Sequence, residues 1–102
     1  MNKKPFRLIG AAFFLMDQEW INNFQIKLDE HYSWPALYIF KFIVPIEKEE
    51  ELKSLFPLHV STEKRSTQGK YVSITFNMMM PSSNAVIEVY GRVSSIEGII
   101  AL

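Results

Sequence analysis

Ten consecutive residues, Tyr71 to Met80, alternate between apolar side chains and mostly polar ones. The apolar positions are Val72, Ile74, Phe76, Met78 and Met80, and the positions between them are Tyr71, Ser73, Thr75, Asn77 and Met79. Successive side chains of a β-strand point to opposite faces of a sheet, so this pattern predicts a strand with one buried and one mostly solvated face. The chain must therefore cover one side of its sheet and leave the other side open.

The composition bounds the size and the chemistry of the domain. The chain has 102 residues, of which 48% are hydrophobic and 14% aromatic, and this suits one compact domain. It contains no cysteine, which excludes disulfides, thiolate metal sites and a cysteine nucleophile, and which fits a cytoplasmic location. Eleven basic and eleven acidic residues leave no net charge, so no overall attraction to nucleic acid or anionic lipid is expected.

The leading residues 1–16 require separate treatment. Three basic residues precede an apolar run from Leu8 to Met16, which is too short to span a bilayer, since a spanning helix takes about 20 residues. Three interpretations are open: an extension upstream of a natural start at Met16, a packed or frayed tail, and a signal or anchor. We treat residues 17–102 as a single domain and expect no membrane segment in it.

Periodicity places the first elements of this domain. Apolar residues recur at helical spacing from Asp17 to Glu30, and Asp17 is a candidate cap for this leading helix. A run rich in aromatic and β-branched residues lies between Pro35 and Pro45 and predicts a buried strand at 36–44.

A second helix and a hairpin follow this strand. The apolar helical face consists of Ile46, Leu52, Leu55 and Phe56, with the glutamates of 47–51 on the exposed side. Pro57 ends the helix, and an alternation from Leu58 to Glu63 predicts a second strand. Gly69 lies at the centre of the turn that leads into the strand at 71–80.

The last elements complete the order of the fold. Apolar residues at helical spacing from Val86 to Ile96 predict a final helix, and residues 98–102 predict a short closing strand. The order after the leading helix is strand, helix, strand, strand, helix, strand, which is the ferredoxin-like split βαβ pattern, βαββαβ. We therefore expect an α+β fold with a four-stranded antiparallel sheet and two helices on one face, preceded by an N-terminal helix.

The residue types give no catalytic or metal site. His31 and His59 lack the spacing of metal ligands, and the chain contains neither a G-x-S-x-G elbow nor a phosphate-binding glycine loop. The glutamates of 47–51 are expected to form a solvated helix face. We therefore expect no enzyme activity, no cofactor and no bound metal.

The strand at 71–80 resembles the stacking strand of an RNA-recognition motif only in part. Such a motif needs two exposed aromatic residues at alternate positions, but Ser73 stands where the second would follow Tyr71. Nucleic acid is therefore not the expected partner. A weak RNA binder, kept as the third hypothesis, would use Tyr71, Lys70, Arg65 and Lys41.

One basic cluster stands out, formed by Lys64, Arg65 and Lys70 beside Gly69. Turn amides with nearby cations are suited to hold an anion or an acidic partner surface. The alternative is that these charges only keep the hairpin soluble.

Three segments, "YSWPALYIFKFIVP", "STEKRSTQGKYVSITFNMMM" and "VIEVYGRVSSIEGIIAL", resemble the YbeD-like family in order and separation. These small bacterial proteins are grouped as a domain of unknown function. The resemblance implies a ferredoxin-like fold close to ACT regulatory domains, a regulatory or partner-binding role and no assigned catalytic residues. ACT domains that bind amino acids use a glycine-containing loop after the first strand, where Pro45 and Ile46 stand here.

We therefore expect a non-enzymatic regulatory or interaction domain that acts through the open face or an edge of its sheet on a protein partner or a second copy. The apolar residues expected on that face are Leu37, Ile39, Ile43, Tyr71 and Met79, and such groups are costly unless covered. The leading helix is an alternative cover for them. The candidate interaction surface consists of Lys41, Arg65, Lys70, Tyr71, Ser73 and Met79. The second hypothesis is an ACT-like sensor of a small-molecule ligand.

Overall fold

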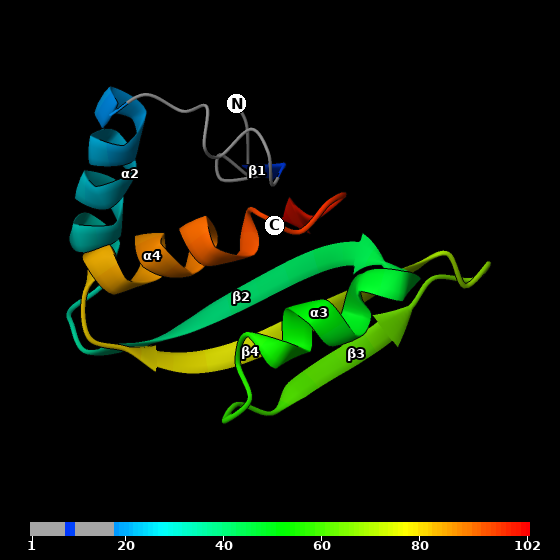
Figure 1. Ribbon diagram of the computed structural model, residues 1–102. Helices are drawn as coiled ribbons and strands as arrows, with labels where there is room; N and C mark the ends of the chain where they lie inside the picture. The colour runs from blue at the N-terminus through cyan, green and yellow to red at the C-terminus, as the bar shows by residue number, and fades with distance from the viewer. Residues whose placement is uncertain (1–7, 10–17) are drawn as a thin grey trace.

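The computed structural model describes residues 8–9 and 18–102, and Figure 1 shows the arrangement of their elements. In chain order these are β1 (Leu8–Ile9), α2 (Gln18–His31), β2 (Ala36–Pro45), the short 3-10 helix η1 (Ile46–Lys48), α3 (Glu49–Ser54), β3 (Ser61–Arg65), β4 (Tyr71–Met80), α4 (Ser83–Val93) and β5 (Ile100–Ala101). The expected cap Asp17 and most of the leading segment lie outside the described residues.

The fold is α+β, with one antiparallel sheet in the order β1-β5-β2-β4-β3. The four strands expected from the sequence form the run β5-β2-β4-β3, which is compatible with the ferredoxin-like pattern. All four expected strands are present, and Leu8 and Ile9, which pair with Ala101 and Ile100, add a short fifth strand that the sequence did not predict. Two residues of the leading segment thus belong to the sheet.

The two long central strands determine which side chains are buried. β2 and β4 pair along their whole length, from Ala36 opposite Met80 to Pro45 opposite Tyr71. The inner face of these strands is built from Tyr38, Phe40, Phe42, Val44, Val72, Ile74, Phe76, Met78 and Met80, all of which are buried. The alternation predicted for residues 71–80 is therefore confirmed, and β2 shows the same alternation.

The helices cover this inner face. α3 and α4 lie over it in Figure 1 and add Leu52 and Val86 to the core. α2 packs against α4, and the ring of its Phe24 lies 5.8 Å from the ring of Tyr90. The idea that the leading helix covers the opposite face is wrong, because Phe24 and Leu28 bury its apolar side in the same core.

Two element boundaries differ from the sequence-based expectation. β3 begins at Ser61 and not at Leu58, and the side chains of Leu58 and Val60 are 92% and 90% exposed in the connection that precedes it. α4 ends at Val93, three residues before Ile96, because the chain turns there with a hydrogen bond from the Ile96 amide to the Val93 carbonyl. The sequence pattern assigns the apolar residues of both connections to a strand and a helix, because periodicity alone does not distinguish a connection from the end of a regular element.

Candidate interaction surface

The face of the sheet opposite the helices carries a compact group of exposed apolar side chains. Leu37 and Met79 stand opposite each other on β2 and β4, and Ile39 follows Leu37 on the same face. The exposed fractions are 56% for Leu37, 60% for Ile39 and 65% for Met79. These three residues, the apolar row, are what the described part of the chain leaves uncovered at this end of the sheet.

The other end of the same face is polar and cationic. The register places Ser73 between Ile43 on β2 and Lys64 on β3, and it places Lys41 opposite Thr75. Opposite residues of antiparallel strands share a face, so Lys64 and Lys41 belong to the open face. Among the β2, β3 and β4 residues of this face, Lys41 and Lys64 are the charged ones.

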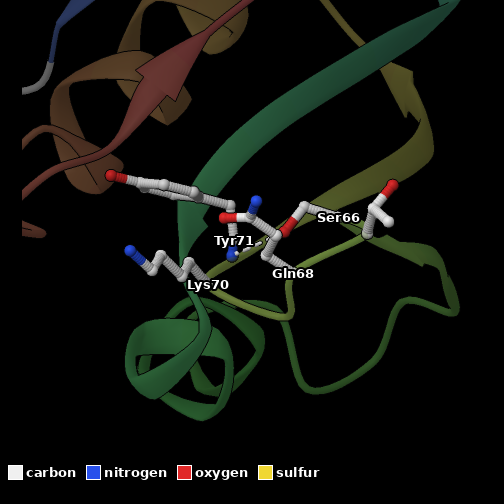
Figure 2. Close-up of a pocket in the computed structure, with 5 residues that line it drawn as sticks. Ser66, Gln68, Lys70 and Tyr71 are labelled. Atoms are coloured by element: carbon white, nitrogen blue, oxygen red, sulfur yellow. Dashed lines mark hydrogen bonds between the residues drawn. The ribbon is translucent and has the colours of Figure 1, made fainter.

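The turn from β3 to β4 closes this polar end, and Figure 2 shows the residues around it. The Ser66 Oγ accepts a hydrogen bond of 3.1 Å from the Tyr71 amide, and the Ser66 amide donates to the Tyr71 carbonyl at 2.9 Å. Gly69 has a φ of 73°, which favours glycine over other residues at this position. The turn therefore holds the half-exposed ring of Tyr71 at the end of the face, with the Lys70 side chain beside it in Figure 2.

A shallow hollow of about 300 Å³ lies between this turn and the sheet. Its lining consists of Ile43, Lys64, Arg65, Ser66, Tyr71 and Ser73. The lining combines the phenol ring of Tyr71, the hydroxyl groups of Ser66 and Ser73 and the outward-facing Lys64, and such groups suit an anionic ligand.

Arg65 does not lie with the other basic residues of its cluster. It stands opposite the buried Val72, so it belongs to the helix-covered side of the sheet. Its Nη2 donates a hydrogen bond of 2.7 Å to the Glu49 carboxylate on α3. The basic residues therefore lie on two sides of the sheet. Lys64 is on the open face, and Arg65 links β3 to α3 on the helix-covered side.

Glu49 corrects the expectation of a fully solvated glutamate face on this helix. Its side chain is only 10% exposed, and it accepts from Lys53 at 3.3 Å as well as from Arg65. Lys53 also lies 3.3 Å from the Glu63 carboxylate of β3. Two carboxylates and two cations thus form a network that joins α3 to β3.

The charges of this network shift the ionisation of its members. The hydrogen bond from the Ser61 hydroxyl, together with Lys53, holds the pKa of the Glu63 carboxyl below its usual range although partial burial opposes this. Partial burial disfavours the charge of Lys53, but its hydrogen bonds to Glu49 and Glu63 outweigh that effect and raise the pKa of its ammonium group. Both shifts favour the charged forms, as expected for paired groups in a structural network.

A second polar contact lies inside the core, where the Tyr38 and Tyr90 hydroxyl groups are 3.1 Å apart. Burial raises the pKa of the Tyr38 hydroxyl, partly offset by its hydrogen bond to Tyr90. Burial also raises the pKa of Tyr90, with the neighbouring Tyr38 as a further cause. Both groups are therefore held in the neutral form, and their hydrogen bond links β2 to α4.

The structure separates the six candidate residues into three groups. Tyr71, Ser73, Met79 and Lys41 share the open face, as the alternation predicts. Lys70 lies in the turn beside them, and Arg65 is turned towards α3. Phe76 is fully buried, so the aromatic pair of an RNA-stacking strand is not present on β4. The Glu49 network is the part that sequence reasoning missed.

The described residues show neither a metal-binding cluster nor a membrane-spanning helix. Within residues 8–9 and 18–102, no group of three or more histidines, cysteines or acidic residues is placed to hold a metal ion. In the same part of the chain, no helix has the length and apolar character that crossing a membrane requires.

Comparison with known proteins identifies a family and no more. The model of a family described as "Protein of unknown function (DUF493)" matches residues 29–102. This confirms the expected resemblance, because the YbeD-like proteins form the DUF493 family. No curated protein and no solved structure gave a significant match.

Proposed function

We propose that this protein, which belongs to the DUF493 family of proteins of unknown function, is a non-catalytic regulatory or interaction module that binds another protein through the open face of its sheet. The observation that supports the proposal is the apolar row, whose three side chains are each more than half exposed on the open face of the sheet. Clustered apolar groups of this kind are typical of interaction sites, whereas scattered ones are ordinary.

The apolar row offers a useful amount of binding free energy. Fully burying a leucine, isoleucine or methionine side chain contributes about 1.5–3 kcal/mol. Since Leu37, Ile39 and Met79 are each a little over half exposed, covering them would contribute about 3–5 kcal/mol in total. This is enough to orient a partner but not to hold it alone, because association has its own entropic cost.

The charges on the same face indicate the chemistry of the partner. Lys41 and Lys64 flank the polar end of the face, and Lys70 lies in the adjoining turn. A partner with an apolar patch and acidic groups to one side of it would match both ends. Such charges at the rim of an interface mainly raise the association rate and make it depend on salt.

A matched pair of double variants tests this proposal. Ile39→Lys with Met79→Lys places two charges in the apolar row, and Leu58→Lys with Val60→Lys makes the same chemical change at exposed apolar positions off the sheet. Each variant and the original protein are immobilised and used to capture proteins from native lysate, which are quantified by mass spectrometry. Circular dichroism checks that all three are folded.

We expect a protein that is captured by the original chain and by the Leu58/Val60 variant and lost with the Ile39/Met79 variant. The captured protein, once purified, should bind more weakly as salt is raised. If every captured protein binds both double variants equally well, the open face is not the binding surface and the proposal fails.

A second function is favoured by the hollow beside Tyr71. An ACT-like sensor would bind a small anionic ligand there, and binding to the native state raises the unfolding temperature by mass action. The test is thermal unfolding with a panel of amino acids and with inorganic phosphate. We expect a concentration-dependent rise that Lys64→Met reduces, and the sensor hypothesis fails if no compound shifts the transition.

A further inference from the structure

β2 is paired along its whole length on one side and along only a small part on the other. β4 covers all of it, from Ala36 to Pro45. On the opposite side β5 pairs with Phe42 and Ile43, and the Leu102 amide adds a hydrogen bond of 2.9 Å to the Lys41 carbonyl. In Figure 1, β5 accordingly lies near the C-terminal end of β2.

The direction of the Lys41 carbonyl shows where the neighbouring backbone groups point. In an antiparallel strand the N–H and C=O groups of alternate residues point to the same side. Because the Lys41 carbonyl points to the β5 side, the amides and carbonyls of Ile39 and Leu37 point there as well. Within the described part of the chain, no strand is paired with β2 beside these two residues.

The side chains of Leu37 and Ile39 are exposed as well as their backbone groups. Leu37 and Ile39 belong to the apolar row, and their side chains are 56% and 60% exposed. Backbone groups at a free sheet edge are a template for a further strand. Here the free edge and the exposed apolar side chains coincide.

We propose that a second copy of the chain pairs with this edge, with residues 36–40 of the two β2 strands antiparallel and Leu37 opposite Ile39 of the other copy. A two-fold axis then passes beside Tyr38. Each Leu37–Ile39 pair exchanges two hydrogen bonds, so the free amide and carbonyl groups of both residues are satisfied in both copies. The two sheets join into one, and pairing stops at Lys41 because Leu102 occupies the next position.

Self-pairing is favoured at this edge because its chemistry is self-complementary. The two-fold places leucine beside isoleucine on the outer face, and apolar cross-strand pairs are stabilising. The nearest charges on β2 are the two Lys41 side chains, which this register holds about 20 Å apart, six residues of strand. No like charges meet along the paired segment.

The other free edge, β3, is unsuited to the same association. A two-fold axis at the β3 edge keeps each side chain on its own face of the sheet. The residue on the axis therefore pairs with the same residue of the second copy. Centring the axis on Glu63 or Lys64 brings two identical charges together, and charged residues on an edge strand are a known protection against such pairing. These charges favour β2 over β3 as the edge where two copies meet.

The absence of cysteine allows a specific cross-linking test. Leu37→Cys and Ile39→Cys are prepared separately, then oxidised alone and as an equal mixture. In the proposed register a cysteine at one position lies about 5.5 Å from the other position in the second copy, within the range for a disulfide. Two copies of the same variant are two residues out of register, with Cα atoms about 7–8 Å apart.

We expect a covalent dimer that forms mainly in the mixture and contains one chain of each variant by mass spectrometry. Light scattering coupled to size exclusion should show the unmodified protein at twice its chain mass at high concentration. A monomer at every concentration, or cross-linking that is as efficient within each single variant as in the mixture, overturns the proposal.

A further pair of variants tests the backbone pairing itself. Ile39→Pro removes an amide that points away from β4, so the central ladder keeps its hydrogen bonds, while Ile39→Thr removes apolar surface and keeps the amide. We expect the proline variant to be monomeric and the threonine variant to remain dimeric. If the two variants dimerise equally, the edge is not paired through its backbone.

These outcomes are independent of the proposed function, which concerns the face of the sheet. A protein that stays monomeric but loses a partner with Ile39→Lys and Met79→Lys retains the proposed function and loses this inference. A dimeric protein that captures no partner from lysate retains this inference and loses the proposed function.

Discussion

Neutralising the Glu49 carboxylate should destabilise the protein more than any neighbouring glutamate change on the same helix. Glu49→Gln keeps the shape of the side chain but removes the charge that Arg65 and Lys53 share. Because the Glu49 side chain is 10% exposed, water replaces little of what is lost. The two cations that remain are then held near each other without their common anion.

The expected magnitude lies between two limits. A hydrogen bond to a charged group contributes about 1.5–3 kcal/mol, and a surface ion pair contributes about 0.2–1 kcal/mol. Arg65 is 56% exposed, so its partner is screened on one side and the upper limit does not apply. We therefore expect Glu49→Gln to lower the free energy of unfolding by about 1–2 kcal/mol, or about 4–8 °C in Tm for each kcal/mol.

The matched control is Glu51→Gln. Glu51 is 47% exposed and lies 3.5 Å from Lys48, so it has an ion pair of the ordinary surface kind. Its loss should change stability by no more than about 0.5 kcal/mol. Urea unfolding of both variants, followed by circular dichroism, measures the difference. Equal stability of the two variants would show that burial of Glu49 does not strengthen its pairs, and the reasoning would be refuted.

Two further predictions concern the backbone and the core. Gly98→Ala should lower the free energy of unfolding by about 2 kcal/mol, because Gly98 has a φ of 83° and a Cβ there would lie 3.0 Å from the Pro45 ring; thermal unfolding checks this, and an unchanged Tm would contradict it. The raised pKa values of Tyr38 and Tyr90 contribute stability that is present below the unfolded-state pKa of about 10 and is lost as the pH rises above it. Tyr90→Phe should therefore reduce the loss of unfolding free energy above pH 10 by about 1.4 kcal/mol per pH unit; parallel pH profiles for the two proteins would exclude this cause.

The elements that the sequence predicted well are those in which one physical pattern decides the structure. Tyr71 to Met80 was predicted as a strand and is observed as one with the same bounds, because its alternate side chains face either a packed core or solvent. The aromatic run of β2 was also predicted as a strand, and Leu37, Ile39 and Ile43 lie on its open face as expected. The register of such long strands is strongly determined, since a shift by one residue would expose the whole core face.

The sequence-based prediction failed for residues whose polarity does not match their burial. Leu58 and Val60 are apolar but lie in a connection, where no other element covers them. Glu49 is acidic but buried, because it lies between α3 and β3, where its carboxylate pairs with Arg65. Arg65 is basic but turned towards the helices, because the hairpin register places it opposite the buried Val72. That register, and not the local charge, was the missing information.

The chemistry of the two free edges follows from what each strand does inside the domain. β3 faces a helix whose inner side carries Glu49 and Lys53, so its inward positions are charged, and it presents charge at its edge as well. β2 faces an aromatic core, and its residues from Ala36 to Phe40 are apolar on the open face as well. Charged residues protect the β3 edge from pairing with another strand, while the apolar residues of the β2 edge give no such protection. This difference between the two edges favours β2 for the pairing with a second copy that we propose.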